Sequence, residues 1–182
     1  VVVAADLGGD YYDVLPTEGG GWLAIGDASG HGLTSGLVMM MVQAGVAALV
    51  RARPDGSPRE VLATLNRVVY ENVHARLDAE RHMTLSLVRY RADGELVVAG
   101  AHMDVIAWRA ASGRCELLRT PGTFLGLAED IDHVNVEVTW RLAPGDVLVA
   151  LTDGVTEAEA PDGEPFGYDR ACAAVAAQAW SY

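Results

Sequence analysis

The sequence contains no lysine, only two cysteines and only two phenylalanines. All 13 basic residues are therefore arginines. The chain has 25 acidic residues, so its formal net charge is −12. Nucleic-acid phosphates and anionic membrane surfaces attract clustered cations, so this balance argues against both as the main partner. An acidic protein that binds an anionic substrate needs a local source of positive charge, and bound metal ions would supply one.

The two cysteines, Cys115 and Cys172, lie far apart in the sequence and have no metal-ligand spacing. They fit a reducing compartment as well as they fit a disulfide, and no secretory signal is visible. We therefore expect a cytoplasmic protein, or the cytoplasmic domain of a larger sensor protein. The chain begins inside the apolar run Val1–Ala5 without a start methionine, so we expect a segment cut from a longer protein.

No apolar run is long enough for a typical membrane span. The run Leu37–Val50 covers 14 residues, includes Gln43 and is followed by Arg51, whereas a spanning helix needs about 20 apolar residues. We predict a core helix here, with no insertion of this segment into a membrane. Because the wider stretch Leu33–Ala52 is apolar almost all round, we also predict burial on more than one side. With 182 residues, 51% of them hydrophobic, residues 1–182 are predicted to form one domain.

Turn signals divide the rest of the chain into short elements. The glycine-rich connector Pro16–Gly21 predicts a hairpin, and Ser57 with Glu60 three residues later predicts the start of a second helix. The expected later strands and last helix are Met83–Tyr90, Glu95–Ala99, Val105–Trp108, Cys115–Leu118, Val134–Trp140, Val147–Leu151 and Tyr168–Trp180. This segregation of strands and helices predicts an α+β fold, with sheets packed on each other and helices outside.

Two aspartates follow buried strands directly. Asp27 lies in the turn Gly26–Gly32 after the strand-like run Trp22–Ile25, and Asp153 follows the last apolar run. Strand ends of one sheet can bring two carboxylates close together, which is costly unless a cation lies between them. Taken alone, Asp153 suits the N-cap of a helix better than it suits a metal ion, and Asp10 suits an ordinary turn.

The histidines leave two interpretations open. His31 lies in the glycine turn, where it could contact a substrate or lock the turn through a hydrogen bond, and His102 could line a cleft. We interpret His74, His82 and His133 as incidental. No Gly-x-Ser-x-Gly elbow is present, so a serine-hydrolase triad is not predicted.

Three motifs in this order resemble those of the bacterial PPM (PP2C-like) serine/threonine phosphatases, in the branch that includes RsbU and SpoIIE. The motifs are Gly8–Asp13 (Gly-Gly-Asp-Tyr-Tyr-Asp), Gly26–Gly32 (Gly-Asp-Ala-Ser-Gly-His-Gly) and Thr152–Ala158 (Thr-Asp-Gly-Val-Thr-Glu-Ala). Phe166-Gly167 and the stretch Leu142–Asp146 extend the resemblance to nearly the whole chain.

The resemblance implies an α-β-β-α sandwich, two mainly antiparallel sheets flanked by helices, with a centre of two Mn²⁺ or Mg²⁺ ions. By the family pattern, Asp27 would bridge both ions, the carbonyl of Ala28 would complete one, and Asp10 and Asp153 would each bind one. With Asp10, Asp27 and Asp153 as catalytic ligands, metal-activated water would hydrolyse phosphoserine or phosphothreonine. The implied substrate is a phosphorylated STAS-domain protein, an anti-anti-sigma antagonist.

One departure from the family pattern concerns the end of the chain. The family's last strand opens with Asp-Asp-x-Thr, which supplies a further metal ligand, and this chain has no such motif before Tyr182. Asp169 is a poor substitute because it starts the last predicted helix. We therefore expect weaker binding of the Asp153-side ion. The alternative functions are a catalytically weakened phosphatase-like sensor or partner-binding module and, less favoured, a hydrolase of small phosphate esters. A dimer would form through regions outside this segment.

Overall fold

The computed structural model describes residues 8–77 and 81–178, which form two compact units. The first unit contains residues 8–77, 81–102 and 121–140, and the second contains residues 103–120 and 141–178. The predicted apolar start Val1–Ala5 and the predicted helix end at Trp180 lie outside the described residues.

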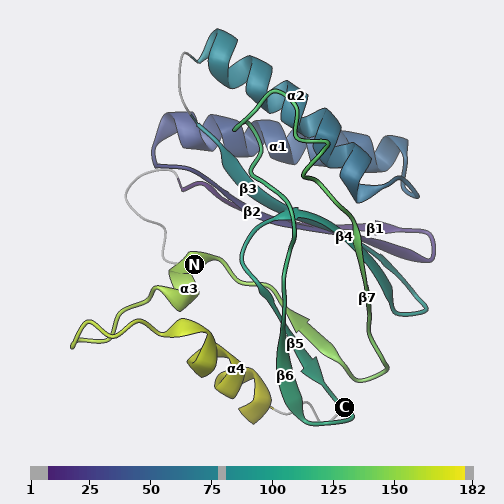
Figure 1. Ribbon diagram of the computed structural model, residues 1–182, viewed down its shortest axis with the longest axis vertical. Coiled ribbons are helices and arrows are strands. Elements are labelled where there is room, and N and C mark those ends of the chain that lie inside the picture. Colours follow the sequence, from purple (N-terminus) through teal and green to yellow (C-terminus); the bar gives the residue numbers. More distant parts are fainter. Residues whose placement is uncertain (1–7, 78–80, 179–182) are drawn as a thin grey trace. The chain divides into compact units, whose positions relative to one another are not determined.

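A five-stranded sheet, ordered β1-β2-β3-β4-β7, forms the base of the first unit (Figure 1). Its strands are β1 (Asp10–Thr17), β2 (Gly20–Ala28), β3 (Met83–Arg91), β4 (Glu95–Ala101) and β7 (Val138–Arg141). The pairs β1–β2, β2–β3 and β3–β4 are antiparallel. The hairpin predicted from the connector Pro16–Gly21 is thus confirmed, and β3 and β4 form a second antiparallel pair.

Helices α1 (Leu33–Ala52) and α2 (Pro58–Arg76) cover one face of this sheet (Figure 1). The predicted start of α2 is confirmed, because the Ser57 hydroxyl accepts the backbone N–H of Glu60 at 3.2 Å and Pro58 is the first helical residue. An uncapped helix start would leave this N–H without a partner.

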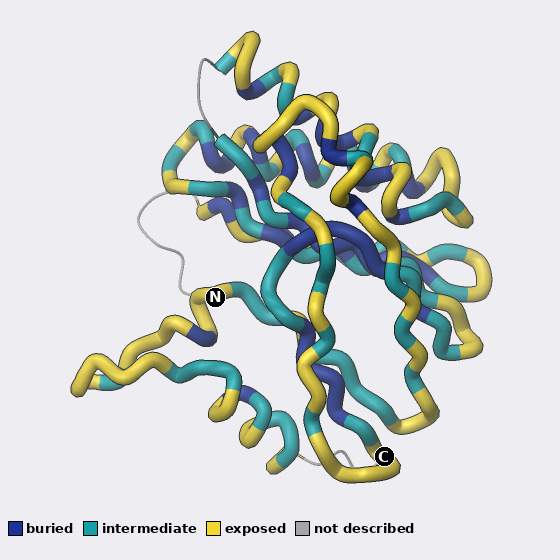
Figure 2. The backbone as a smooth tube through the Cα atoms, viewed as in Figure 1, coloured by how far each residue is buried: buried dark blue, intermediate teal, exposed yellow. Residues whose placement is uncertain are grey.

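The core of the first unit lies between the two helices and the sheet. On β2, Trp22, Ala24 and Ala28 are buried and face the helices, whereas Asp27 lies on the other face because strand side chains alternate. Figure 2 shows the buried residues of this unit gathered on the strands and on one side of each helix. Trp22 is fully buried, and its indole N–H donates to the carbonyl of Pro54 at 2.7 Å, which ties the sheet to the end of α1.

The expectation that no apolar run reaches membrane-spanning length is wrong for helix α1 as a whole. By length and composition alone its 20 residues, with a mean hydropathy of 1.9, are long and apolar enough to cross a membrane. In the structure its valines at every fourth position, Val38 to Val50, are buried against the sheet and α2, as predicted for a core helix. The prediction of burial on several sides is wrong for its outer face, where Leu33, Leu37 and Met40 are exposed. Among the described residues of this unit, nothing covers that face.

The second unit contains a three-stranded antiparallel sheet, ordered β6-β5-β8. Its elements are β5 (Val105–Arg109), β6 (Arg114–Leu118), β8 (Val147–Val149), α3 (Asp153–Thr156) and α4 (Gly167–Ala177). The mixed α+β class with two antiparallel sheets and helices is therefore confirmed. The apolar run Val147–Leu151 forms a shorter strand than predicted, ending at Val149.

The predicted strand Val134–Trp140 is wrong over its first half. The N–H groups of Val134 and Asn135 donate to the carbonyl of Ile131, which makes a turn, and β7 begins only at Val138. Asn135 is buried while Val134 is exposed, opposite to what an apolar-in alternation would give. The turn holds this segment against α2, where the carboxylate of Glu137 accepts the Ser57 hydroxyl at 2.6 Å.

Candidate functional site

The predicted site residues of the first unit lie at one end of neighbouring strands in the five-stranded sheet. β1 begins there with Asp10, and β2 ends there with Asp27 and Ala28, so that Asp10 pairs directly with Asp27. On the other side of β2, Asp27 pairs with Thr84 of β3. This register brings together residues that lie 17 and 57 positions apart in the sequence.

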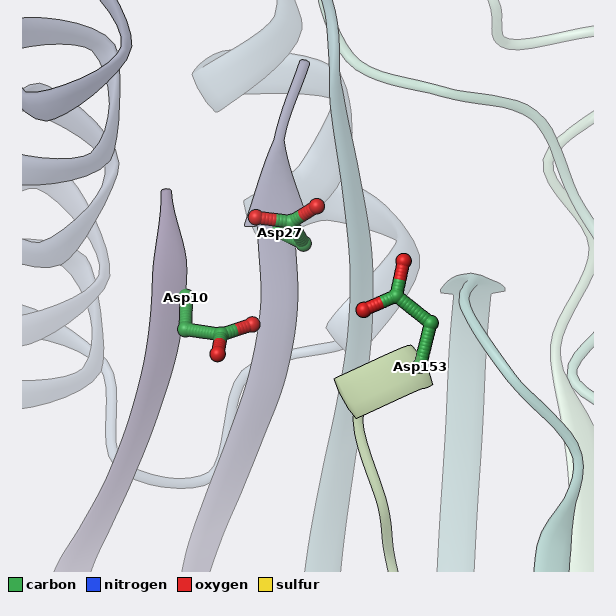
Figure 3. A group of neighbouring side chains, drawn as sticks. All are labelled: Asp10, Asp27 and Asp153. Carbon is green, nitrogen blue, oxygen red and sulfur yellow. The ribbon is translucent and has the colours of Figure 1, made fainter. Parts of the chain in front are cut away.

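The carboxylates of Asp10 and Asp27 lie on the same face of the sheet, opposite α1 and α2. One carboxylate oxygen of each residue lies within 4.8 Å of the other, and Figure 3 draws both side chains at the ends of their strands. Like charges directly opposite each other across two strands destabilise a sheet. The pair is therefore a cost to folding unless a cation binds between the carboxylates.

Gly9 leaves the room that this arrangement requires. Its carbonyl accepts the backbone N–H of Ala28 at 3.1 Å, so the two chains run very close together. A Cβ atom at Gly9 would lie 2.6 Å from a carboxylate oxygen of Asp27 and would collide with the Ala28 carbonyl. Glycine at this position keeps both oxygens accessible from that side.

Thr84 holds the backbone of Asp27 in place from the neighbouring strand. Its hydroxyl accepts the N–H of Asp27 at 2.9 Å and lies 3.2 Å from the Asp27 carbonyl oxygen. The same hydroxyl is 2.9 Å from Nδ1 of His102, at the end of β4. His102 is thus connected to Asp27 through Thr84. Sequence reasoning missed Thr84, because only the strand register shows that it faces Asp27.

The turn after Asp27 is fixed by three hydrogen bonds at Ser29. The N–H of Ser29 donates to the His82 carbonyl at 2.8 Å, and the Ser29 hydroxyl accepts the His82 N–H at 3.1 Å. The Ser29 carbonyl accepts the Ser35 hydroxyl at 2.8 Å. Gly30 and Gly32 both adopt positive φ, 78° and 83°, which explains the two glycines of this motif.

Neither Asp27 nor Asp153 is a helix cap. The N-cap of α1 is Gly32, and the N-cap of α3 is Thr152, with no side-chain cap at either helix start. The capping alternative predicted for Asp153 is therefore wrong. Asp153 is the first residue of α3, in the second unit, and its side chain is drawn in Figure 3.

The other candidates from the sequence are placed as follows. Asp13 lies on the same strand face as Tyr11, opposite to the face of Asp10. The pKa of the Tyr11 hydroxyl is raised, mainly by burial and to a smaller extent by the negative charge of Asp13. His31 is exposed in the glycine turn. The rings of His82 and Phe124 stack with centroids 5.5 Å apart, and Nδ1 of His74 lies 2.9 Å from the Tyr70 carbonyl.

The donor set at the sheet edge suits a hard divalent cation. Asp10 and Asp27 offer carboxylate oxygens, Ala28 offers a carbonyl, and no sulfur or imidazole is needed. Mg²⁺ and Mn²⁺ prefer such oxygen ligands. The cradle at Gly9, which any larger residue would fill, agrees with an ion held close to the backbone.

Known proteins resemble this chain in sequence and in fold. A profile of the family described as Stage II sporulation protein E (SpoIIE) matches residues 17–181. Phosphoserine phosphatase RsbU of Bacillus subtilis (strain 168) is 29% identical over 164 residues, which are 89% of this chain and 47% of that relative. The chain therefore spans about half the length of this relative.

Solved structures share the fold at lower identity. The SiaA-PP2C domain of Pseudomonas aeruginosa aligns with a TM-score of 0.76 and 23% identity, over 95% of this chain and 67% of that one. The RsbU and RsbW domains of Rv1364c from Mycobacterium tuberculosis align with a TM-score of 0.75 and 21% identity, over 98% of this chain and 48% of that one. RsbX in complex with magnesium aligns with a TM-score of 0.63 and 13% identity, over 97% of this chain and 85% of that one.

Proposed function

Because this chain belongs to the SpoIIE family, the bacterial PPM phosphatase domains of the RsbU and SpoIIE type, we propose that it is a metal-dependent protein phosphatase. Its substrates are phosphoserine or phosphothreonine on a regulatory protein. The observation that carries the proposal is the in-register pair Asp10 and Asp27, two carboxylates opposed on one sheet face at the strand end that also carries Ala28. The name of the relative RsbU, a phosphoserine phosphatase, supports the same reaction class.

Asp10, Asp27, Asp153 and the carbonyl of Ala28 would hold two Mn²⁺ or Mg²⁺ ions. A magnesium complex is described for the fold neighbour RsbX, which supports a divalent ion in this fold. When bound, such ions polarise phosphoryl oxygens and lower the pKa of a bound water, so that hydroxide is available near neutral pH. The absence of a serine-hydrolase elbow from the sequence agrees with a nucleophile that is not a side chain.

The residues of this chain supply position and access. Thr84 fixes the peptide of Asp27 through its N–H, so the carboxylate is directed from a rigid strand and not from a loop. Gly9, Gly30 and Gly32 contribute no side chain of their own at these strand ends. A phosphorylated side chain can therefore approach the carboxylate pair closely.

We propose a STAS-type anti-anti-sigma protein as the phosphorylated partner and the cytoplasm as the place of action. Structural neighbours support a regulatory partner: one of them contains RsbU and RsbW domains in one protein, and another belongs to work on the bacterial stressosome. The net charge of −12 is consistent with a protein partner that presents a basic surface around its phosphoserine.

The direct experiment is a phosphate-release assay with a phosphorylated STAS-domain protein, in Mn²⁺ and after chelation. The proposal predicts turnover that requires the divalent ion and that decreases with a serine-to-alanine version of the substrate. If Mn²⁺ binds while no phosphoprotein or phosphopeptide is hydrolysed, the proposed activity is wrong. The alternative of a phosphatase-like sensor or partner-binding module then replaces it.

A further inference from the structure

A guanidinium group lies beside the glycine turn that follows Asp27. Arg81 comes two residues before β3, and its Nη1 donates to the carbonyl of Ser29 at 3.3 Å. Two hydrogen bonds between Ser29 and His82, one through the backbone and one through the Ser29 hydroxyl, continue the β2–β3 pairing beyond the strands. Arg81 is therefore held at the same sheet edge as the Asp10 and Asp27 carboxylates.

Gly30 provides the surface on which this guanidinium rests. A Cβ atom at Gly30 would collide with Nη1 of Arg81 and would lie 2.9 Å from its Cζ. Gly30 also has a φ of 78°, a conformation that other residues rarely adopt. Both the bare face and the backbone shape of Gly30 thus allow Arg81 to lie against the turn.

Most donors of Arg81 remain available to a ligand. A guanidinium carries five N–H donors, and the hydrogen bond to Ser29 uses one of them. Within the described residues, no carboxylate lies within ion-pair distance of Arg81, whereas Arg109 is paired with Glu116 and Asp146. A half-buried cation next to two carboxylate-bearing strand ends, in a chain of net charge −12, is placed to meet an anion.

We propose that Arg81 binds the phosphate group of the substrate, which makes it a specificity-determining residue of the site; this inference rests on the proposed phosphatase function. The Ser29 carbonyl holds one end of the guanidinium, and the remaining N–H groups are free to form a two-pronged contact with phosphate oxygens. Arginine suits this role because its planar fork matches phosphate and stays charged at every physiological pH.

A structural role for Arg81 would need only the hydrogen bond to Ser29. The variant Arg81→Gln keeps a donor for that carbonyl but removes the charge, and Arg81→Lys keeps the charge but removes the fork. Arg91→Ala is the matched control, because Arg91 is an exposed arginine at the opposite end of the same strand. For each protein, Mn²⁺ affinity and melting temperature report on the metal site and on folding.

The binding test is calorimetric titration of the Mn²⁺-loaded protein with inorganic phosphate, followed by phosphopeptide kinetics. We expect Arg81→Gln to weaken phosphate binding and to raise KM by about 10- to 100-fold, with Mn²⁺ affinity and melting temperature kept. Arg81→Lys should lie between it and the wild type, and Arg91→Ala should match the wild type.

Wild-type phosphate affinity and KM in Arg81→Gln would overturn the assignment, as would an equal loss in Arg91→Ala. A change confined to melting temperature would also overturn it, because the residue would then be structural. The phosphate titration needs no turnover. If the wild-type protein fails to hydrolyse phosphopeptides, the proposed function is wrong, and the titration still decides whether Arg81 binds phosphate.

Discussion

Individual aspartates in this chain differ in whether their negative charge is balanced by neighbouring groups. Asp146 is almost fully buried, and its carboxylate accepts N–H groups of Ala110 and Ala143 and the guanidinium of Arg109, each at 2.9 to 3.0 Å. Asp10 and Asp27 instead face each other as like charges. These three hydrogen bonds mark Asp146 as structural, and the opposed pair Asp10 and Asp27 marks a site that needs a cation.

We predict that Asp146→Asn destabilises the protein by about 2–4 kcal/mol at pH 7, because it leaves Arg109 without its buried partner. Desolvation by burial raises the pKa of Asp146, but the N–H group of Ala143, the Arg109 guanidinium and the N–H group of Ala110 together lower it below its ordinary value. A lowered folded-state pKa means that this stabilisation is complete above the unfolded-state pKa. It is lost as pH falls through the folded-state value.

Urea unfolding of the wild type and the variant at pH 7 and at pH 3 measures the effect. The difference between the two proteins should shrink at the lower pH. The control is Asp162→Asn, an exposed turn residue, which should cost less than about 1 kcal/mol. A difference that grows on acidification would contradict the account of Asp146.

At the scale of elements, α2 is held at its start by a cap that comes from two segments. Ser57 accepts the Glu60 N–H and donates to the carboxylate of Glu137, which also accepts the Arg59 N–H at 3.1 Å. We predict that Ser57→Ala lowers the free energy of unfolding by about 1–2 kcal/mol. Thr64→Ala is the control, because Thr64 only bonds back to its own helix at the Glu60 carbonyl.

A double-mutant cycle of Ser57→Ala with Glu137→Gln tests the second half of the cap. The two residues share a hydrogen bond, so their effects should fail to add by at least about 0.5 kcal/mol. Additive effects, or a Ser57→Ala cost no larger than that of Thr64→Ala, would show that the segment before β7 does not hold α2.

The elements differ in how far the sequence predicts them. Ser57, Pro58 and Glu60 define the start of α2 because capping is local chemistry. The alternation Val134 to Val138 predicts a strand, but the turn at Ile131 and the long-range bonds of Glu137 decide the structure there. The hydrophobic periodicity of a segment cannot show the bonds of Glu137, because their partners lie 78 and 80 residues away in the sequence.

The site shows the same division. The motifs single out Asp10, Asp27 and Ala28, and the strand register then brings the two aspartates opposite each other. Thr84 and Arg81 carry no motif signal, because their importance follows from pairing with Asp27 and the Ser29–Gly30 turn. The alternatives for His31 stay predictions, whereas His102 gains a defined partner in Thr84.

At the scale of the whole molecule, an acidic chain is expected to gain stability from divalent cations. If Asp10, Asp27 and Asp153 bind metal, saturation at about 100 times Kd should add about 2.7 kcal/mol and raise the melting temperature by roughly 5–10 °C. Asp153→Asn should reduce this gain, and Asp169→Asn, a change in the first turn of α4, should leave it intact. A melting temperature that does not change in millimolar Mn²⁺ would contradict the metal site.

The most direct test of the central claim is phosphopeptide turnover by Asp27→Asn at saturating Mn²⁺. Without metal, this variant should be at least as stable as the wild type, because it removes one charge of the opposed pair. The account predicts that kcat/KM falls by at least about 100-fold, since several kcal/mol of charge stabilisation are lost. Near-wild-type turnover by the folded variant would show that the Asp10–Asp27 pair is not the catalytic metal site.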